Sequence, residues 1–275
     1  MDTDTSASTR IAVLIDCDNV SSSHAAAVME ELARYGTPTI KRAYGDWTTG
    51  RLVGWKQELN RLAIQPVQQF SYTTGKNATD SALIIDAMDL LWAGNVEAFA
   101  LVSSDSDFTR LATRLRESGK KVYGLGRRQT PESLRKAVDQ FIYLELLGKE
   151  LDEAELPAAS APTAPAASSD GRTSATPEES EAVDAAAETG QSSSINLQSA
   201  LVRAINATSG DDGWASLGPL GQHLNRAHTD FDPRDFGHPK LSTLVDAQPY
   251  LETRRTGAGT MQVRIKGSGR AGRRT

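Results

Sequence analysis

The sequence predicts an α/β domain with a three-layer, mostly parallel sheet, followed by a smaller α+β domain. Three observations lead to this fold class. Short apolar runs alternate with segments of helical spacing through residues 9–148, an order typical of right-handed βαβ crossovers. Residues 11–15 form an unbroken apolar run that stops at polar residues, as in a strand buried on both faces. A long segment poor in large apolar residues then precedes a second region of helical spacing.

The predicted strands are short, and polar or glycine-containing turns separate them. Pro66 favours an edge position or a strand start for the third strand, because proline cannot donate a ladder hydrogen bond. In chain order the expected strands are residues 11–15, 39–44, 64–70, 98–102, 122–125 and 140–144.

The predicted helices lie between these strands and have apolar residues at helical spacing. Gly36 and Gly119 end two of them, and Thr130 with Pro131 provides a cap and a first-turn proline for a short helix. The expected helices are residues 25–35, 52–63, 78–92, 109–117 and a short segment after residue 131.

Residues 149–194 are mostly Ala, Pro, Ser, Thr and acids, so we expect a disordered acidic linker that cannot offset its ordering entropy. Helical spacing returns beyond it. Three helices, at residues 197–205, 217–227 and 233–247, precede two short strands, at residues 250–254 and 261–265. This layout predicts a winged-helix domain over residues 195–266, followed by a basic tail at 267–275.

Composition limits the class of protein. The net charge of −5 is uneven: residues 149–190 hold ten acids and two bases (net −8), whereas residues 196–275 hold eleven bases and seven acids (net +4). A single cysteine, Cys17, excludes an internal disulfide and a cysteine-based metal cage. The polar N-terminus does not resemble a signal peptide, and no apolar run is long enough to span a membrane. We therefore expect a cytoplasmic protein.

Acidic residues gather at the ends of two predicted strands and at the start of one helix. Asp16 and Asp18 follow the first strand, Asp105 and Asp107 follow the fourth, and Asp80 lies in the first turn of the preceding helix. In a doubly wound sheet these positions converge on one rim. Mg²⁺ and Mn²⁺ prefer carboxylate oxygens and assist phosphoryl transfer, so the pattern favours metal-dependent phosphodiester hydrolysis.

Each acid taken alone also has a structural interpretation. Asp18 and Asn19 suit the start of a helix, and Asp107 suits the N-cap of the helix that ends at residue 117. Asp80 suits a helical first turn, where a negative charge complements the helix dipole. Both interpretations stay open for single residues, and the coincidence of the three places favours a shared site.

The first domain resembles the NYN domains in three motifs. These are Asp16-Cys17-Asp18-Asn19, then Gly75-Lys76 with Asp80, then Ser104-Asp105-Ser106-Asp107-Phe108, in the same order and spacing. The resemblance covers the whole first domain and implies a PIN-like ribonuclease with a Rossmann-like sheet. It implies that Asp16, Asn19, Asp80, Asp105 and Asp107 are catalytic, the aspartates holding Mg²⁺ or Mn²⁺.

Other residues near this site have weaker support. Asp18 takes a position that looks variable among NYN domains and therefore ranks below the other acids. Asp86 faces elsewhere on its helix and is not expected to bind the metal. Basic residues near the mouth of the site are candidate contacts for RNA phosphates, with solvated surface charge as the alternative. They are Lys76, Arg127 and Arg128.

The second domain resembles the LOTUS, or OST-type helix-turn-helix, domain. The resemblance rests on the stretches around Gly213-Trp214-Ala215-Ser216-Leu217 and Phe231-Asp232-Pro233-Arg234-Asp235-Phe236-Gly237-His238-Pro239-Lys240-Leu241. It implies a module that binds RNA or protein partners. Lys240, Arg254 and Arg255 are the candidate phosphate contacts, again with solvated charge as the alternative.

These features predict a metal-dependent endoribonuclease tethered to an RNA- or partner-binding module, which raises the local substrate concentration. One alternative is a non-catalytic RNA-binding or regulatory protein that retains the nuclease fold. The presence of all five site residues disfavours it. Another is a DNA-binding regulator that uses its helix-turn-helix, which the low charge of the third helix region disfavours.

Overall fold

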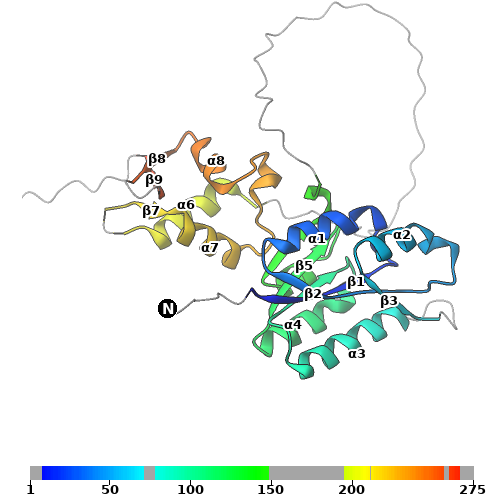
Figure 1. Ribbon diagram of the computed structural model, residues 1–275. Coiled ribbons are helices and arrows are strands. Elements are labelled where there is room, and N and C mark those ends of the chain that lie inside the picture. The colour runs from blue at the N-terminus through cyan, green and yellow to red at the C-terminus, as the bar shows by residue number, and fades with distance from the viewer. Residues whose placement is uncertain (1–7, 71–77, 149–194, 211, 257–259, 267–275) are drawn as a thin grey trace, which may run out of the picture.

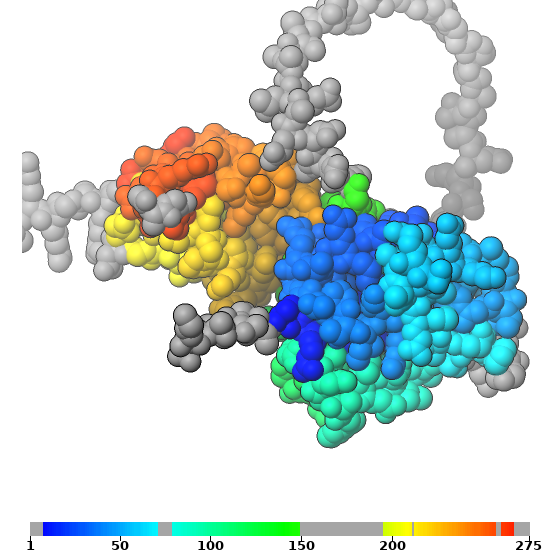
Figure 2. Space-filling model, viewed as in Figure 1, coloured from blue at the N-terminus to red at the C-terminus, as the bar shows by residue number. Residues whose placement is uncertain are grey.

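The computed structural model describes residues 8–70, 78–148, 195–210, 212–256 and 260–266. These residues form an α/β unit and a smaller α+β unit, which contact each other (Figures 1 and 2). The expected linker at 149–194, the expected tail at 267–275 and the candidate RNA contact Lys76 lie outside the described residues.

The α/β unit is built on a six-stranded sheet in the order β3-β2-β1-β4-β5-β6, in which every pairing is parallel. The strands are β1 (Arg10–Asp16), β2 (Thr37–Gly45), β3 (Gln65–Gln68), β4 (Ala98–Val102), β5 (Lys121–Gly126) and β6 (Gln140–Tyr143). The predicted parallel sheet is confirmed, and β3 occupies the expected edge.

Helices cover both faces of this sheet, which completes the three layers (Figure 1). They are α1 (Ala25–Ala33), α2 (Val53–Arg61), α3 (Ala78–Ala93), α4 (Thr109–Glu117) and α5 (Glu132–Ala137). Side chains of β1 alternate between two cores: Ile11, Val13 and Ile15 pack with α1 and α2. Ala12 and Leu14 pack with α3, α4 and α5. The unbroken apolar run is thus a strand buried on both faces, as predicted.

One local expectation in this unit is wrong. Pro131, rather than Thr130, is the N-cap of α5, and no side chain caps that helix. The Thr130 hydroxyl instead donates to the carbonyl of Arg127 at 2.6 Å. The Thr130 hydroxyl, which the sequence pattern assigned to the helix cap, therefore stabilises a short turn before the helix instead.

The α+β unit combines three helices with a three-stranded antiparallel sheet. Its elements are α6 (Leu197–Thr208), β7 (Ala215–Ser216), α7 (Leu217–Ala227), α8 (Leu241–Asp246), β8 (Leu251–Arg255) and β9 (Met261–Ile265), with strand order β7-β9-β8. Leu201, Leu220, Leu244 and Val263 are fully buried in its core. The predicted α+β class is confirmed. Of the helices that the structure describes, none combines the length and apolar character needed to cross a bilayer.

The single third helix predicted over residues 233–247 is wrong. The structure has a short 3-10 helix, Pro233–Phe236, and then a separate α8. Gly237 ends the first piece with a φ of +79°, the left-handed conformation that glycine adopts readily. Pro239 then disfavours helical geometry at the residue before it. The Asp232 side chain caps the 3-10 helix by accepting from the Arg234 N–H.

Candidate metal centre

The floor of the candidate site is set by the parallel register of β1 and β4. Ile15 pairs with Val102, so Asp16, the last residue of β1, and Ser103, which follows β4, lie side by side at the carboxyl ends of these strands. The Ser103 hydroxyl donates to Asp16 Oδ2 at 2.8 Å. The sheet itself thus places a buried serine against the first-strand carboxylate.

Asp16 is fully buried and held by three donors. Asn19 Nδ2 donates to Asp16 Oδ2 at 2.7 Å, beside the bond from Ser103, and the Asp18 N–H donates to Oδ1 at 3.1 Å. Burial raises the pKa of Asp16, and these hydrogen bonds oppose that rise. Donors stabilise the charged form of the carboxyl group, whereas desolvation favours the neutral acid.

The loop after β4 is organised by Asp105. Its N–H donates to the Ser103 hydroxyl at 3.1 Å, and its side chain accepts from the Asp107 N–H at 2.9 Å. Asp105 is thereby the N-cap of the 3-10 helix Ser106–Phe108 that leads into α4. The structural interpretation of Asp107 as the N-cap is wrong, and its side chain is exposed.

Three carboxylates meet above this floor. Asp80 comes from the first turn of α3, Asp105 and Asp107 come from the loop after β4, and one oxygen of each lies within 4.8 Å of the others. Oxygens on opposite sides of a bound Mg²⁺ lie about 4 Å apart. We call these three residues the acidic trio. Their donor type and spacing fit a hard divalent cation after small side-chain rotations.

Within the acidic trio, Asp80 lies among several other carboxylates. Burial, followed by repulsion from neighbouring acids, raises the pKa of Asp80 from an ordinary 3.8 to about 6. The repelling groups are Asp16, Asp105, Asp107 and Asp18. Within the described part of the chain, no lysine or arginine forms an ion pair with Asp80 or Asp105. A bound cation would relieve this repulsion.

The five residues expected from the sequence therefore take different positions. Asp80, Asp105 and Asp107 form the compact group, whereas Asp16 lies outside it with its oxygens occupied by donors. Asn19 acts on Asp16, so its observed role is to position that carboxylate. A metal-ligand role for Asp16 stays a prediction.

Asp86 occupies a separate polar cluster on the same helix. Its carboxylate pairs with Arg42 and accepts from the Tyr44 hydroxyl. This agrees with the expectation that Asp86 faces away from the acids at the rim.

Two hydroxyl residues were missed by the sequence interpretation. Ser103 joins Asp16 to the Asp105 loop, and the Thr79 hydroxyl donates to Asp18 Oδ2 at 3.1 Å. Ser103 could have been predicted from the sequence, because it follows the fourth predicted strand just as Asp16 follows the first. Thr79 could not, because its partner Asp18 lies on a different element.

The candidate RNA contacts of the α/β unit differ in availability. Arg127 is exposed, and its N–H donates to the Ser104 hydroxyl at 2.9 Å. The Arg128 guanidinium pairs with Asp235 of the α+β unit and lies 5.1 Å from the centre of the Tyr143 ring. Arg128 therefore contributes to the contact between the units.

The candidate contacts of the α+β unit lie on its surface. Lys240 is exposed at the start of α8, and Arg255 is exposed at the end of β8. Arg254 lies over the Trp214 ring at 4.1 Å and pairs with Asp212 at 3.1 Å. Roles of these cations in RNA binding stay predictions.

Each of the two units matches the model of a known protein family. The family model of the NYN domain matches residues 10–145, and the model of the OST-HTH/LOTUS domain matches residues 193–263. The NYN domain belongs to a PIN-like nuclease family, and OST-HTH/LOTUS domains bind RNA. Both resemblances noted in the sequence are confirmed, in the order expected.

Solved structures resemble parts of the chain. A protein of unknown function from Vibrio parahaemolyticus is 21% identical, with a TM-score of 0.44, and the match covers 52% of this chain and 96% of that one. A fragment from Chromobacterium violaceum is 31% identical (TM-score 0.24; 29% of this chain, 90% of that one). An uncharacterized protein from Nitrosomonas europaea is 28% identical (TM-score 0.25; 36% and 100%). No curated protein matches the chain.

None of these structural scores reaches 0.5, so the assignment comes from the two family models. Their matched residues coincide with the six-stranded parallel sheet and with the antiparallel α+β unit. The chain therefore contains an NYN domain of the PIN-like nucleases, followed by an OST-HTH/LOTUS domain.

Proposed function

We propose that this chain is a metal-dependent endoribonuclease whose acidic trio binds Mg²⁺ or Mn²⁺ and whose OST-HTH/LOTUS unit binds RNA. The observation that carries the proposal is the convergence of Asp80, Asp105 and Asp107 within 4.8 Å beside the buried Asp16. The NYN family supplies the nuclease class, and the acidic cluster supplies the donor set.

Each residue at the rim has a distinct task in this proposal. Asp80, Asp105 and Asp107 supply the carboxylate oxygens that hold the cation. When bound, such a cation activates water and neutralises charge on the phosphoryl group under attack. Asn19 and Ser103 orient the Asp16 carboxyl group beside the trio through hydrogen bonds, which favour its charged form. The Asp105 cap fixes the approach of the loop to α3.

The test is cleavage of an end-labelled single-stranded RNA by the full chain, with Mn²⁺ or with EDTA. We expect cleavage only with the metal, and a loss of more than about 100-fold in Asp105→Asn, since even outer-shell partners of a metal contribute about 10- to 100-fold. Asp89→Asn is the matched control, because Asp89 is an exposed acid on α3 outside the trio. A circular RNA of the same sequence tests the endonucleolytic mode.

The outcomes separate the alternatives. Equal rates for Asp105→Asn and Asp89→Asn would remove the acidic trio from the reaction. Absence of cleavage with either metal would favour the non-catalytic RNA-binding protein. Resistance of the circular RNA alone would leave an exonuclease. We also propose that the chain acts in the cytoplasm and that its OST-HTH/LOTUS unit binds protein partners.

A further inference from the structure

The α+β unit docks on the β6 edge of the α/β sheet through the segment between α7 and α8. The Phe141 N–H of β6 donates to the carbonyl of Thr229 at 2.7 Å, and the Thr229 hydroxyl donates to the carbonyl of Arg135 at 2.7 Å. Main-chain pairing of this kind covers an exposed sheet edge.

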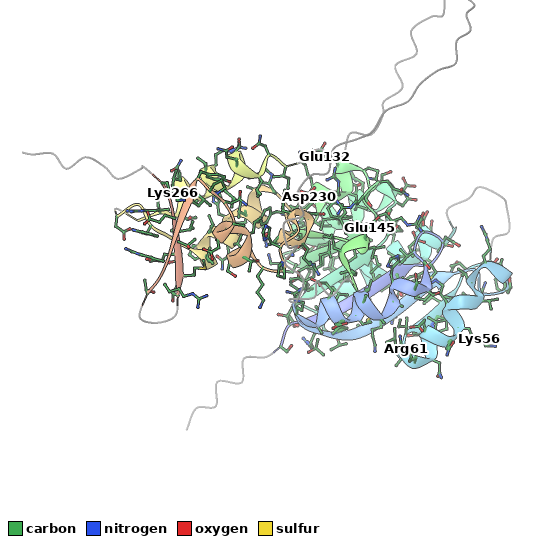
Figure 3. The ribbon with its side chains drawn as sticks, turned by 90° about the horizontal axis from the view of Figure 1, so that it is seen from above. Lys56, Arg61, Glu132, Glu145, Asp230 and Lys266 are labelled. Carbon is green, nitrogen blue, oxygen red and sulfur yellow. The ribbon has the colours of Figure 1, made fainter. Side chains whose placement is uncertain are left out.

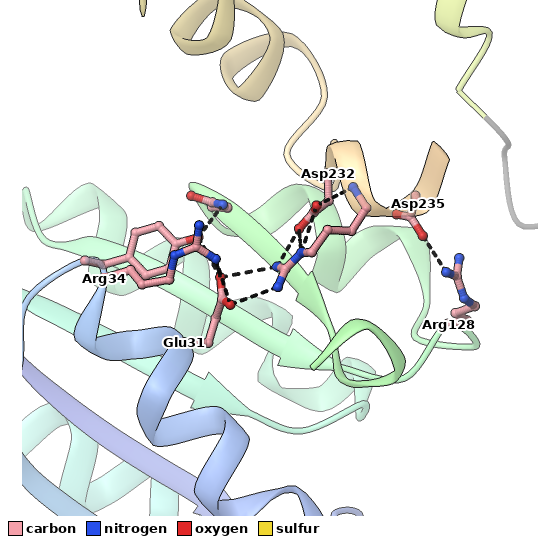
Figure 4. A network of polar contacts seen from close by, with 8 residues as sticks. Glu31, Arg34, Arg128, Asp232 and Asp235 are labelled. Atoms are coloured by element: carbon pink, nitrogen blue, oxygen red, sulfur yellow. Dashed lines mark hydrogen bonds and ion pairs between the residues drawn. The ribbon is translucent and has the colours of Figure 1, made fainter. Parts of the chain in front are cut away.

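Ion pairs fix the orientation of the docked units. Arg234 pairs with Glu31 on α1 at 3.0 Å, and Arg128 pairs with Asp235 (Figure 4). Arg135 also pairs with Asp230. The side chains of Glu31 and Arg135 are only 5% and 7% exposed. Charged side chains are rarely buried without partners. These buried ion pairs therefore indicate a specific interface in which the two units have a defined relative orientation.

This docking encloses a cleft of about 500 Å³ between the units, within the usual range of ligand sites. One wall is the polar face of α7, and the other is formed by the end of α4 and the starts of β5 and β6. The α7 wall contributes Gln222, Asn225 and Arg226. The opposite wall contributes Arg116, Lys121, Tyr123, Asp139 and Gln140.

The cleft has an excess of positive charge in a chain whose net charge is −5. Arg116 and Lys121 share the single carboxylate of Asp139, at 3.5 and 3.6 Å. Arg226 is exposed, and it forms no ion pair with any of the residues that the structure describes. A second hollow continues from Arg116 and Lys121 and adds Lys120 and Glu117. The lining of the cleft itself has three cations, Arg116, Lys121 and Arg226, against the single acid Asp139, which suits a polyanion.

The uncharged polar side chains of the cleft indicate which kind of polyanion fits it. The carboxamides of Gln222 and Asn225 offer both donors and acceptors next to Arg226, which suits the edges of unpaired bases beside their phosphates. The lining therefore suits single-stranded RNA better than a simple phosphate ion.

The cleft lies at the opposite end of the sheet from the acidic trio. Lys121 begins β5, whereas the trio lies beyond the carboxyl ends of β1 and β4, and the six residues of β5 separate these edges by about 17 Å. An RNA in the cleft therefore leaves the metal centre free, and a longer strand can reach both.

We propose that the cleft between the docked units is a second binding site for single-stranded RNA, assembled from both domains. The identity of the polyanion rests on the proposed ribonuclease function. The site anchors the RNA backbone through Arg226, Arg116 and Lys121, away from the metal centre. The RNA thus contacts both units at once, in a cleft that exists only while the two units are docked.

The test is the binding of a fluorescent 20-nucleotide single-stranded RNA to the full chain in EDTA over a range of salt concentrations. Each phosphate contact to a single strand contributes about 0.7 to the slope of log K against log salt. Arg226→Gln should therefore lower that slope by about 0.7 and weaken binding about fivefold at 0.1 M salt. Lys121→Gln should act in the same direction from the other wall.

The matched control is Arg61→Gln, which removes one exposed cation from α2, away from the α+β unit (Figure 3). It should leave the slope and the affinity unchanged. Equal slopes for the parent, Arg226→Gln and Lys121→Gln would overturn the proposal, as would an equal loss in Arg61→Gln. Because EDTA removes the metal, this result is independent of whether the chain cleaves RNA, which the Mn²⁺ assay decides.

Discussion

Replacing Asp80 by asparagine should stabilise the metal-free protein at neutral pH. The pKa of Asp80 rises from 3.8 to about 6, and each pKa unit corresponds to about 1.4 kcal/mol, which gives an upper limit of about 3 kcal/mol. Asp80 is only partly buried, so solvent screening lowers this to about 1.5 kcal/mol. Loss of a favourable charge in the first turn of α3 removes about 0.5 kcal/mol. A net gain of about 1 kcal/mol remains.

The pH dependence has a definite sign. A carboxyl whose folded pKa is raised binds its proton more tightly in the folded state, so this group lowers the free energy of unfolding as pH rises from about 4 to about 6. In Asp80→Asn this decline in the free energy of unfolding is absent. The stability of the variant relative to the parent should therefore rise between pH 4 and pH 6, and the variant should remain the more stable protein at pH 7.

The assay is thermal unfolding of both proteins in EDTA, at pH 4 and at pH 7. A gain of about 1 kcal/mol corresponds to a midpoint increase of about 2–4 °C for a chain of this size. The advantage should largely disappear at pH 4, which is close to the ordinary pKa of 3.8, because the folded state then binds only a fraction of a proton more at Asp80 than the unfolded state. With Mn²⁺ the order should reverse, because only the parent retains the full ligand set. A variant less stable than the parent at pH 7 in EDTA would refute the reasoning.

Three further changes test the surroundings of the site. Ser103→Ala removes a donor from the buried Asp16 and should cost about 1–3 kcal/mol, measured as a lower urea midpoint; an unchanged midpoint would contradict the buried hydrogen bond. Arg135→Met leaves Asp230 without its buried partner and should weaken docking by about 3 kcal/mol, seen as a larger radius of gyration in solution scattering, which a constant radius would exclude. Gly126→Ala places a Cβ 2.7 Å from the Ser103 carbonyl and should cost about 1–3 kcal/mol in calorimetry, whereas a neutral result would show that this packing relaxes.

Local sequence patterns predicted the α/β unit well because its strands carry their signals within a few residues. The apolar run before Asp16 and Pro66 at the sheet edge are examples. The third helix of the α+β unit was mispredicted because the expected helix ran through Gly237 and Pro239, whose backbone requirements divide it in two.

The candidate site was predictable in part. Strand ends brought Asp105 and Asp107 to the rim, and the helix start brought Asp80 to them. The hydrogen bond of Ser103 to Asp16 depends on the register of two strands that are far apart in the sequence. The ion pair of Arg128 with Asp235 depends on how the two units pack together, and the residues next to Arg128 in the sequence do not indicate this packing.

Calorimetric titration of Mn²⁺ into the full chain without RNA tests the central claim most directly. Shared coordination by Asp80, Asp105 and Asp107 predicts saturable binding to the parent and to Asp89→Asn, with binding lost in Asp105→Asn. Equal binding by Asp105→Asn and the parent, or no binding by the parent, would contradict it.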